Sequence, residues 1–364
     1  MSDRLKLEWR YSALIALIVA TYFAAVAWYA GQHGALGALA LGSLNPLMLA
    51  VFGSTFAILL VVYGVRLALR SRGPGMAARM WRDVREQVLR RDLLLARVTI
   101  LAGWFCMMLA FSPFKSLIGR AHGFTMDPWL SQAAPMLFFG YHGWQITHAV
   151  FGNAVGTAFL QAMYTVWFLI VWWSLIYCIA RSDKLRFRMQ FMLAFLLCWI
   201  LVGSVAAYWL ASAGPCFYQG VFGDPRYAPL MAHLRDLNHQ ITAMAPAWRV
   251  LSLDEQKWLW SSYADNANTF GAGISAMPSM HVAFAALVAR GAFAIDRRAG
   301  WMMSVYAVLI WIASVHLGWH YAIDGIVGAP MGVATWPLAG WILNRTVWRD
   351  EAAPAGLPEG VSAA

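Results

Sequence analysis

Two histidine-containing stretches carry the side chains that could do chemistry in this sequence. The first stretch is Ala272–His281 and the second stretch is Ser314–Asp324. Each lies beside an apolar segment, so each puts histidine where a polar loop meets a hydrophobic run. Imidazole can donate a proton or attack as a nucleophile. If the topology brings the two stretches to one side of a membrane, we expect them to form a phosphate-handling site.

The first stretch ends in Pro278-Ser279-Met280-His281, which predicts the start of a helix. Proline is favoured at the first helical position, and Ser275 or Ser279 can cap the helix. The backbone N–H groups that follow point outward from the positive end of the helix and form a ready anion site. His281, in the same turn, could protonate a leaving oxygen. The alternative is a membrane-interface histidine beside a capping serine.

In the second stretch, His320 and Asp324 are four residues apart, which places them on one face of a helix. A carboxylate in contact would fix the imidazole tautomer and leave the other ring nitrogen free to attack. An aspartate near the top of an apolar segment is costly without a partner, which indicates a functional residue. The alternative is a buried pair that holds two helices together. His316, one turn earlier, could contact a phosphoryl oxygen or lie at the headgroup level.

Composition indicates that membrane-spanning helices position these residues. Hydrophobic residues make up 61% of the chain and charged residues 12%, with 20 tryptophans. This balance is typical of a protein in a bilayer. Several apolar runs reach the roughly 20 residues that a spanning helix needs. We therefore expect an all-α polytopic membrane bundle. The formal charge of +10 comes largely from basic residues in short loops, which is a topology signal rather than a nucleic-acid-binding face.

The spans divide the chain into three predicted regions. Residues 1–95 form a two-span extension with a basic cytoplasmic loop, residues 96–345 form a six-span core, and residues 346–364 form a disordered cytoplasmic tail. The eight predicted spans are 11–30, 47–69, 96–112, 157–180, 189–211, 280–296, 301–317 and 322–343.

Two segments between the core spans are long enough to cover the outer mouth of the bundle. Residues 113–156 contain Asp127-Pro128, which predicts a helix start. Residues 212–278 contain Ser252 and Glu255 at the spacing of a capping box. Tryptophans in both segments favour helices that lie at the headgroup level.

The basic residues predict the orientation of the bundle. With the N-terminus in the cytoplasm and eight crossings, all but six of the 27 lysines and arginines fall on the cytoplasmic side. This bias favours cytoplasmic N- and C-termini, and it places His281 and His320 together on the opposite face. The six outer basic residues are Lys115, Arg120, Arg226, Arg235, Arg249 and Lys257.

Pro-Ser-x-His followed by His-x-x-x-Asp, each at the outer end of a span, resembles the phosphatidic acid phosphatase type 2 superfamily. Three segments resemble one branch of it, the inositol phosphorylceramide synthase-like (aureobasidin-resistance) proteins. The resemblance covers residues 96–345. The three segments are Ser275-x-x-Pro-Ser-Met-His281, Gly318-Trp-His-Tyr-x-x-Asp324 and Gly214-Pro-Cys-Phe-Tyr218.

This resemblance implies a lipid phosphatase or phosphotransferase that needs neither metal nor cofactor and works through a phosphohistidine on His320. Asp324 would orient His320, and His281 would protonate the leaving alcohol. Water or a second alcohol would then take the phosphoryl group, so a phosphorylated headgroup such as phosphoinositol could move between lipids. The phosphoryl oxygens would be held by Ser279, Ser275 and His316.

The sequence lacks two basic motif positions that are usual in the superfamily. The first motif of the superfamily, a lysine followed after six residues by Arg-Pro, is absent before His281, and Ser314-Val315 replaces the usual Ser-Arg. The identity of the group that holds the phosphate is therefore open, and each outer basic residue has the alternative of being only a surface charge. The outer candidates are Arg226, Arg235, Arg249 and Lys257.

Three other functions fit parts of the pattern. An isoprenoid-diphosphate phosphatase would use the same residues. An intramembrane metallohydrolase would use His316-x-x-x-His320, but Leu317 stands where a glutamate base is needed, so no metal site is predicted. A non-enzymatic lipid transporter would need polar residues through the depth of several spans, and these spans are almost purely apolar.

The predicted partner is a membrane lipid (a phospholipid, sphingolipid or isoprenoid phosphate), with no nucleic acid, and the sequence carries no signal for an oligomeric state. We expect a bacterial inner membrane with the site on the periplasmic face. An organellar membrane with a lumenal site would give the same pattern.

Overall fold

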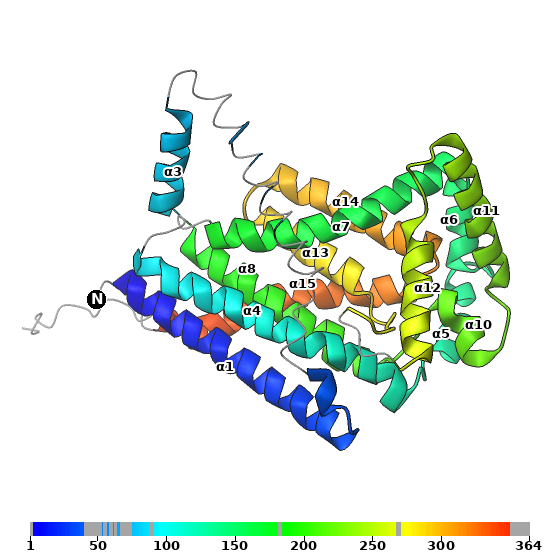
Figure 1. Cartoon of the computed structure of the whole chain (residues 1–364), viewed down its shortest axis with the longest axis horizontal. Helices are drawn as coiled ribbons and strands as arrows, with labels where there is room; N and C mark the ends of the chain where they lie inside the picture. Colours follow the sequence, from blue (N-terminus) through cyan, green and yellow to red (C-terminus); the bar gives the residue numbers. More distant parts are fainter. Residues whose placement is uncertain are drawn as a thin grey trace, which may run out of the picture.

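The computed structural model is a bundle of long α-helices (Figure 1). It describes residues 3–39, 75–87, 91–180, 184–266 and 271–349, together with isolated positions between 53 and 65. No β-strand occurs within these residues. The predicted fold class, an all-α polytopic membrane bundle, is confirmed.

Within the described residues, six helical segments are long and apolar enough to cross a membrane, and each corresponds to a predicted span. The first is α1 (Asp3–Gln32), and the second, Leu101–His122, comprises most of α4 (Arg91–Leu117) and the π-helical η2 (Ile118–His122). The third, Ala154–Leu175, lies in α7 (Ala154–Ala180). The fourth, Leu185–Trp209, comprises α8 (Leu185–Leu197), the π-helical η3 (Cys198–Ala206) and α9 (Ala207–Trp209). The last two are α14 (Arg297–His316) and α15 (Ala322–Arg345).

The predicted span at 280–296 is shorter in the structure. Helix α13 (Met280–Phe293) has 14 residues, which at about 1.5 Å per residue is roughly 21 Å long. Asp296 does not continue the helix, because its carboxylate caps α14 by accepting a hydrogen bond from Ala299 N at 2.9 Å. The predicted span at 47–69 lies outside the described residues, apart from isolated positions.

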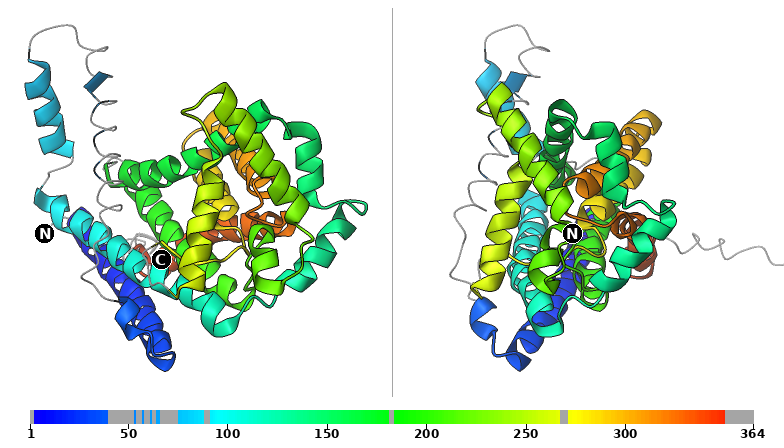
Figure 2. Two further views of the ribbon diagram at one scale, coloured as in Figure 1. Left: turned by 45° about the vertical axis from the view of Figure 1, so that its right-hand side comes forward. Right: turned by 90° about the vertical axis from the view of Figure 1, so that its right-hand side faces the viewer.

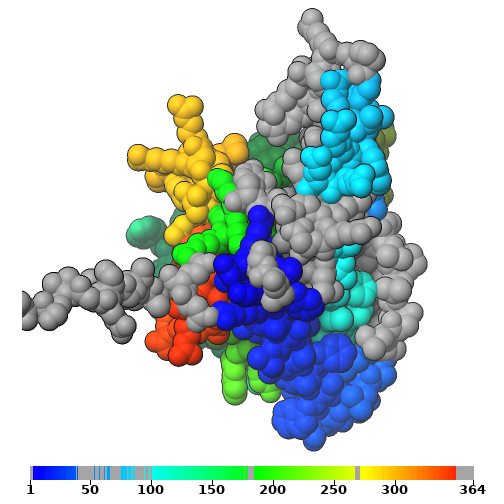
Figure 3. Space-filling view, turned by 90° about the vertical axis from the view of Figure 1, so that its left-hand side faces the viewer, coloured from blue at the N-terminus to red at the C-terminus, as the bar shows by residue number. Residues whose placement is uncertain are grey.

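The first and second stretches lie at one end of the bundle, where α13 begins and α14 ends, and we call this the motif end. The chain starts at the opposite end, which Figure 3 faces. Further helices lie across the motif end (Figure 2), as the two long outer segments predict. These helices are α5 (Asp127–Leu137), α6 (Gly143–Phe151), α10 (Tyr218–Phe222), α11 (Ala228–Met244) and α12 (Leu251–Ala264).

One predicted helix start is confirmed and the other is wrong. Helix α5 begins at Asp127, followed by proline at the next position, but the cap position is Met126 and not Asp127 as predicted. Helix α12 begins at Leu251, so Ser252 lies inside the helix and caps nothing. Its hydroxyl instead accepts a hydrogen bond from Trp319 Nε1 at 3.0 Å. Ser252 therefore ties α12 to the second stretch.

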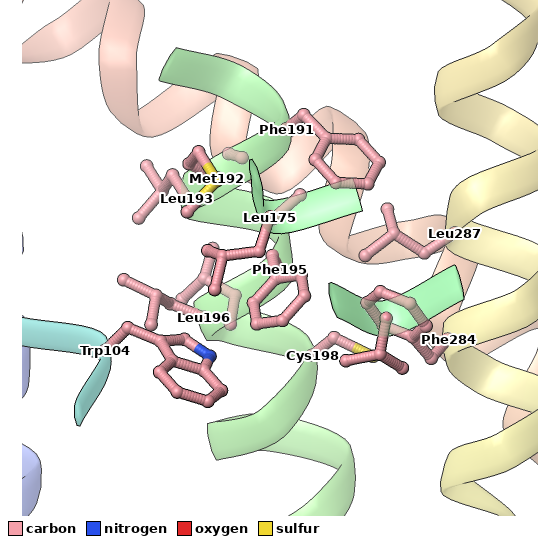
Figure 4. Close-up of a cluster of buried hydrophobic side chains, with 14 of the residues drawn as sticks. Trp104, Leu175, Phe191, Met192, Leu193, Phe195, Leu196, Cys198, Phe284 and Leu287 are labelled. Carbon is pink, nitrogen blue, oxygen red and sulfur yellow. The ribbon is translucent and has the colours of Figure 1, made fainter. Parts of the chain in front are cut away.

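Aromatic side chains fill the core and fix the helix that carries His281. Phe195 of α8 packs edge-on against Phe284 of α13, with ring centroids 5.0 Å apart (Figure 4). Trp104 of α4 packs in the same way against Trp172 of α7, at 4.8 Å. Edge-to-face aromatic pairs are favourable beyond the area they bury, so the first contact positions α13 against α8 and the second positions α4 against α7.

Helix α15 approaches α13 closely because of two glycines. A Cβ atom at Gly328 would lie 2.7 Å from the carbonyl oxygen of Ser279, and one at Gly332 would lie 2.0 Å from that of Ala283. Side chains at these positions would push the two helices apart. The glycines therefore hold the start of α13 against α15.

Polar contacts as well as apolar ones join α1 to the core. Glu8 of α1 and Arg188 of α8 form an ion pair, and their side chains are 0% and 1% exposed. Farther along the same helix, the hydroxyls of Tyr22 and Ser204 are 2.8 Å apart. Helix α3 (Met76–Gln87) lies in the part of residues 1–95 that is predicted to form a basic cytoplasmic loop.

Candidate active site

His320 and Asp324 form a buried pair at the start of α15. Nδ1 of His320 lies 3.2 Å from Oδ2 of Asp324, and the same oxygen accepts a hydrogen bond from Tyr321 N at 3.0 Å. His320 lies two residues before α15 begins at Ala322. The two side chains therefore meet because the chain turns into the helix there, and not because they lie on successive turns of one helix. Since Nδ1 faces the carboxylate, the lone pair of Nε2 is available to a substrate.

His281 lies across from this pair, enclosed by aromatic rings. Its ring centroid is 6.3 Å from that of His320. Tyr164 stacks on it at 4.4 Å and Trp167 lies at 4.2 Å, both from α7. The Trp167 indole N–H also donates to the carbonyl oxygen of His281 at 2.9 Å. Nε2 of His281 is buried and has no hydrogen-bond partner among the described residues, which leaves this nitrogen free to hydrogen-bond to a bound molecule.

Neither Tyr164 nor Trp167 is predicted from the sequence. They are three residues apart on α7 and therefore share a helix face. That spacing is the one signal that could have indicated them, but it is common in membrane helices rich in aromatic residues. Packing between α7 and α13 is what makes these two rings part of the site.

A backbone hydrogen bond joins the first and second stretches. Ser279 N donates to the carbonyl oxygen of Asp324 at 3.0 Å. Ser279 is fully buried and is the cap of α13, its hydroxyl accepting from Val282 N at 3.4 Å. Pro278 therefore precedes the cap and is not the first helical residue. Ser275, one turn earlier in the loop, is half-buried.

His316 has different neighbours from the other two histidines of the site. Helix α14 ends at His316, so the chain turns before it reaches His320. The His316 ring lies 2.9 Å from the hydroxyl of Thr157 and packs against His148 at a centroid distance of 4.1 Å. His148 Nε2 donates to the His316 carbonyl oxygen at 2.9 Å. These contacts anchor the end of α14 to α6 and α7.

The loop that carries His320 is held by the Gly214-Pro-Cys-Phe-Tyr218 segment. Cys216 N donates to the Gly318 carbonyl oxygen at 3.0 Å. Gly214 has a φ of 93°, and a Cβ atom there would lie 2.4 Å from the Trp319 carbonyl oxygen. Only glycine allows both this left-handed backbone and this close approach. The resemblance noted for this segment therefore coincides with a structural contact to the second stretch.

Asp127, predicted only as a helix start, links the loop at Ala213 and Gly214 to the second stretch. Its carboxylate accepts hydrogen bonds from Ala213 N at 2.6 Å, Gly214 N at 2.9 Å and the hydroxyl of Tyr321 at 2.9 Å. Burial raises the pKa of Asp127, and these hydrogen bonds oppose the shift. Because Tyr321 lies next to His320, the carboxylate fixes the backbone from which His320 projects.

Replacing Asp127 with asparagine should lower turnover while the protein stays folded. An amide has only one acceptor oxygen, so at least one buried N–H or O–H loses its partner, at a cost of about 1–3 kcal/mol. We expect kcat to fall roughly 10-fold or more, since a small displacement of a reacting group has large kinetic effects. Size-exclusion elution and helical content should match the wild type. An Asp127→Asn protein with wild-type kcat would contradict this positioning role.

No group of three or more histidine, cysteine, aspartate or glutamate side chains suited to a metal ion gathers within the part of the chain that the structure describes. The groups that the described residues bring together at the site are an imidazole beside a carboxylate, a second imidazole, and the N-terminus of α13.

Comparison with protein-family models gives a match. A family model described as the PAP2 superfamily matches residues 128–338, which is more than half of the chain. The matched residues include α7, α8, α13, α14 and both histidine-containing stretches. Neither a curated protein nor a solved structure matches the chain.

Proposed function

Because the chain belongs to the PAP2 superfamily, we propose that it transfers a phosphoryl group from a membrane lipid through His281, His320 and Asp324. Membership indicates phosphatase-type activity. The six apolar helices indicate an integral membrane protein, and both point to a lipid substrate. The identity of the lipid, the acceptor and the covalent intermediate are part of the proposal.

In the first step, Nε2 of His320 forms a bond to phosphorus as the bond from phosphorus to the lipid oxygen breaks. Asp324 holds Nδ1–H of His320 and stabilises the positive charge that develops on the ring. The leaving oxygen takes a proton from Nε2 of His281. The products of this step are a free alcohol, a phosphohistidine on His320 and a neutral His281.

In the second step, neutral His281 accepts a proton from water or from a second alcohol. The oxygen so activated attacks phosphorus, the bond to His320 breaks, and both histidines return to their starting states. The N-terminus of α13 offers backbone N–H groups to the phosphoryl oxygens. The other proposed contacts to these oxygens come from Ser279, Ser275 and His316.

The joint placement of the two histidines is the observation that carries this proposal. His320 contacts Asp324 at 3.2 Å, and the ring of His281 faces that of His320 at 6.3 Å. His281 is thus close to His320 and Asp324, although about 40 residues separate them in the sequence, and all three lie at the motif end, which further helices cover. A transporter would not require an imidazole oriented by a carboxylate facing a second imidazole.

The acceptor in the second step decides between a phosphatase and a transferase. The Gly214-Pro-Cys-Phe-Tyr218 segment holds the second stretch in place, and its resemblance to inositol phosphorylceramide synthase-like proteins favours transfer of a phosphorylated headgroup. We further propose a site on the periplasmic or lumenal face, opposite the cytoplasmic termini, because of the distribution of basic residues.

A substrate panel tests the proposal. The purified protein would be offered phosphatidic acid, an isoprenoid diphosphate, and phosphatidylinositol with ceramide, with free phosphate and new lipid followed separately. Free phosphate from the first or second substrate would identify a phosphatase. A new phospholipid without free phosphate would identify a transferase. If no substrate in the panel reacts with the wild-type protein, the proposed function fails for these lipid classes.

Turnover is expected to be unchanged in excess EDTA, because the proposed steps use only side-chain imidazoles, a carboxylate and backbone N–H groups. The measurement is the initial rate on the best substrate of the panel, with and without the chelator. Loss of activity that added Mg²⁺ or Zn²⁺ restores would contradict the metal-independent mechanism.

A further inference from the structure

A transferred phosphoryl group carries negative charge, yet the residues placed in the site so far include no lysine or arginine. Two of the predicted clamp candidates are already engaged by acidic side chains, Arg226 by Asp224 at 2.6 Å and Arg249 by Asp254 at 3.2 Å. The two remaining candidates are exposed on the helices that cover the motif end. They are Arg235 on α11 and Lys257 on α12.

A different cation, Lys115, lies in the last turn of α4. Its side chain is half-buried, and it has neither an ion pair nor a side-chain hydrogen bond with any residue in the described part of the chain. Arg120, one turn further on, differs in this respect because it donates to the Ser262 carbonyl oxygen at 3.0 Å. A partly buried ammonium without a counter-charge favours the binding of an anion.

The end of α4 is fixed directly to the first stretch. The hydroxyl of Ser116 donates to the Ala272 carbonyl oxygen at 2.7 Å, and Gly271 N donates to the hydroxyl of Ser112 at 2.6 Å. At Gly273, a Cβ atom would lie 2.8 Å from Ser116 N and 2.9 Å from the carbonyl carbon of Lys115. The backbone of Lys115 is therefore in contact with the loop that leads into His281.

The charge of Lys115 also reaches the site. Besides burial, two side chains act electrostatically on His281, and these are His320 and Lys115. Lys115 therefore acts electrostatically on His281, the proposed acid, although the two residues are more than 160 positions apart in the sequence. An anion between His281 and His320 would lie within reach of its electrostatic field.

We propose that Lys115 is the cation that binds the phosphoryl oxygens of the lipid substrate, in place of the two cations missing from the superfamily pattern. This inference rests on the proposed function, since it assigns a ligand class, a phosphate ester or diphosphate, to the same site. Lys115 lies at the end of α4, which is hydrogen-bonded to the loop that leads into His281. Its ammonium offsets charge on oxygens that neither imidazole contacts.

Equilibrium binding of inorganic phosphate and of orthovanadate to the purified protein tests this assignment without requiring turnover. Lys115→Met keeps most of the apolar stem and removes the charge, whereas Lys115→Arg keeps the charge. We expect the methionine variant to bind both anions about 10- to 100-fold more weakly, the range for losing a hydrogen bond to a charged group. The arginine variant should recover at least part of this affinity. Lys184→Met, at an exposed lysine at the opposite end, is the control for net charge.

The kinetic readout separates this role from a structural one. For the best substrate of the panel, Lys115→Met should raise KM and the inhibition constant of phosphate together, while elution and thermal midpoint stay those of the wild type. Wild-type anion affinity in Lys115→Met, or equal losses in the folded methionine and arginine variants, would overturn the assignment. If the wild-type protein binds neither anion and reacts with no lipid, the proposed function fails instead.

Discussion

Replacing His320 with alanine is expected to lower turnover by about 10⁴-fold or more, because removing an attacking nucleophile typically has effects of this size. Its Nδ1 contacts Asp324 at 3.2 Å, and no other imidazole in the described residues is oriented by a carboxylate in this way. The measurement is the initial rate of phosphate release or lipid formation on the best substrate. His239→Ala, at an exposed histidine on α11, is the matched control and should keep the wild-type rate.

A substrate with a good leaving group separates the roles of the two histidines. The aryl oxide of an aryl phosphate leaves without protonation, so His281→Ala should still give a burst of the aryl alcohol, released as its anion, before the second step stalls. His320→Ala should give no burst. The stalled His281→Ala protein should carry acid-labile, base-stable phosphate. A burst in His320→Ala would place the nucleophile elsewhere and refute the proposed first step.

Replacing Arg188 with methionine is expected to destabilise the protein by about 3–5 kcal/mol, the cost of leaving a buried charge without its partner. Glu8 would remain between α1 and α8 at 0% exposure. The measurement is the unfolding midpoint in a detergent mixture with increasing denaturant. The double variant Glu8→Gln/Arg188→Met should recover most of the loss, because it removes both charges.

The pair formed by Lys6 and Asp3 on the same helix is the matched control for this effect. Their side chains are 52% and 95% exposed, so Lys6→Met should leave the midpoint nearly unchanged, since water screens exposed pairs. Equal midpoints for Arg188→Met and Lys6→Met would mean that the buried pair contributes nothing beyond its surface counterpart.

The sequence allows the long helices to be predicted because each spanning helix is an apolar run of sufficient length. It also predicts that His281 and His320 meet at one end, since the number of crossings and the basic loops determine which junctions share a side. The length of α13 is not predictable in this way. Apolar residues continue through Ala294 and Ile295, while the helix ends at Phe293.

The surroundings of the site depend on packing that a single sequence does not encode locally. His316 and His320 are four residues apart, which predicts a shared face, but α14 ends between them. The sequence around Asp127 indicates only a helix start. Its contact with Tyr321 joins positions 194 residues apart and therefore depends on the fold. Likewise, the sequence does not distinguish Lys115 from the other outer cations. The structure does, because the end of α4 is hydrogen-bonded to Ala272 in the first stretch.

The shortness of α13 has a consequence for where the reaction takes place relative to the lipid. The guanidinium of Arg290, near the far end of this helix, lies 5.0 Å from the centre of the Trp336 ring, and a basic residue at the end of a predicted span is typical of a boundary with water. From Arg290 to its first residue, Met280, α13 rises only about 15 Å, against a hydrocarbon layer of roughly 30 Å. The reacting phosphorus would therefore lie several ångströms below the headgroup plane. On the proposed function, a lipid would have to move deeper into the bilayer to react, and the thickness of the surrounding bilayer would then affect the rate.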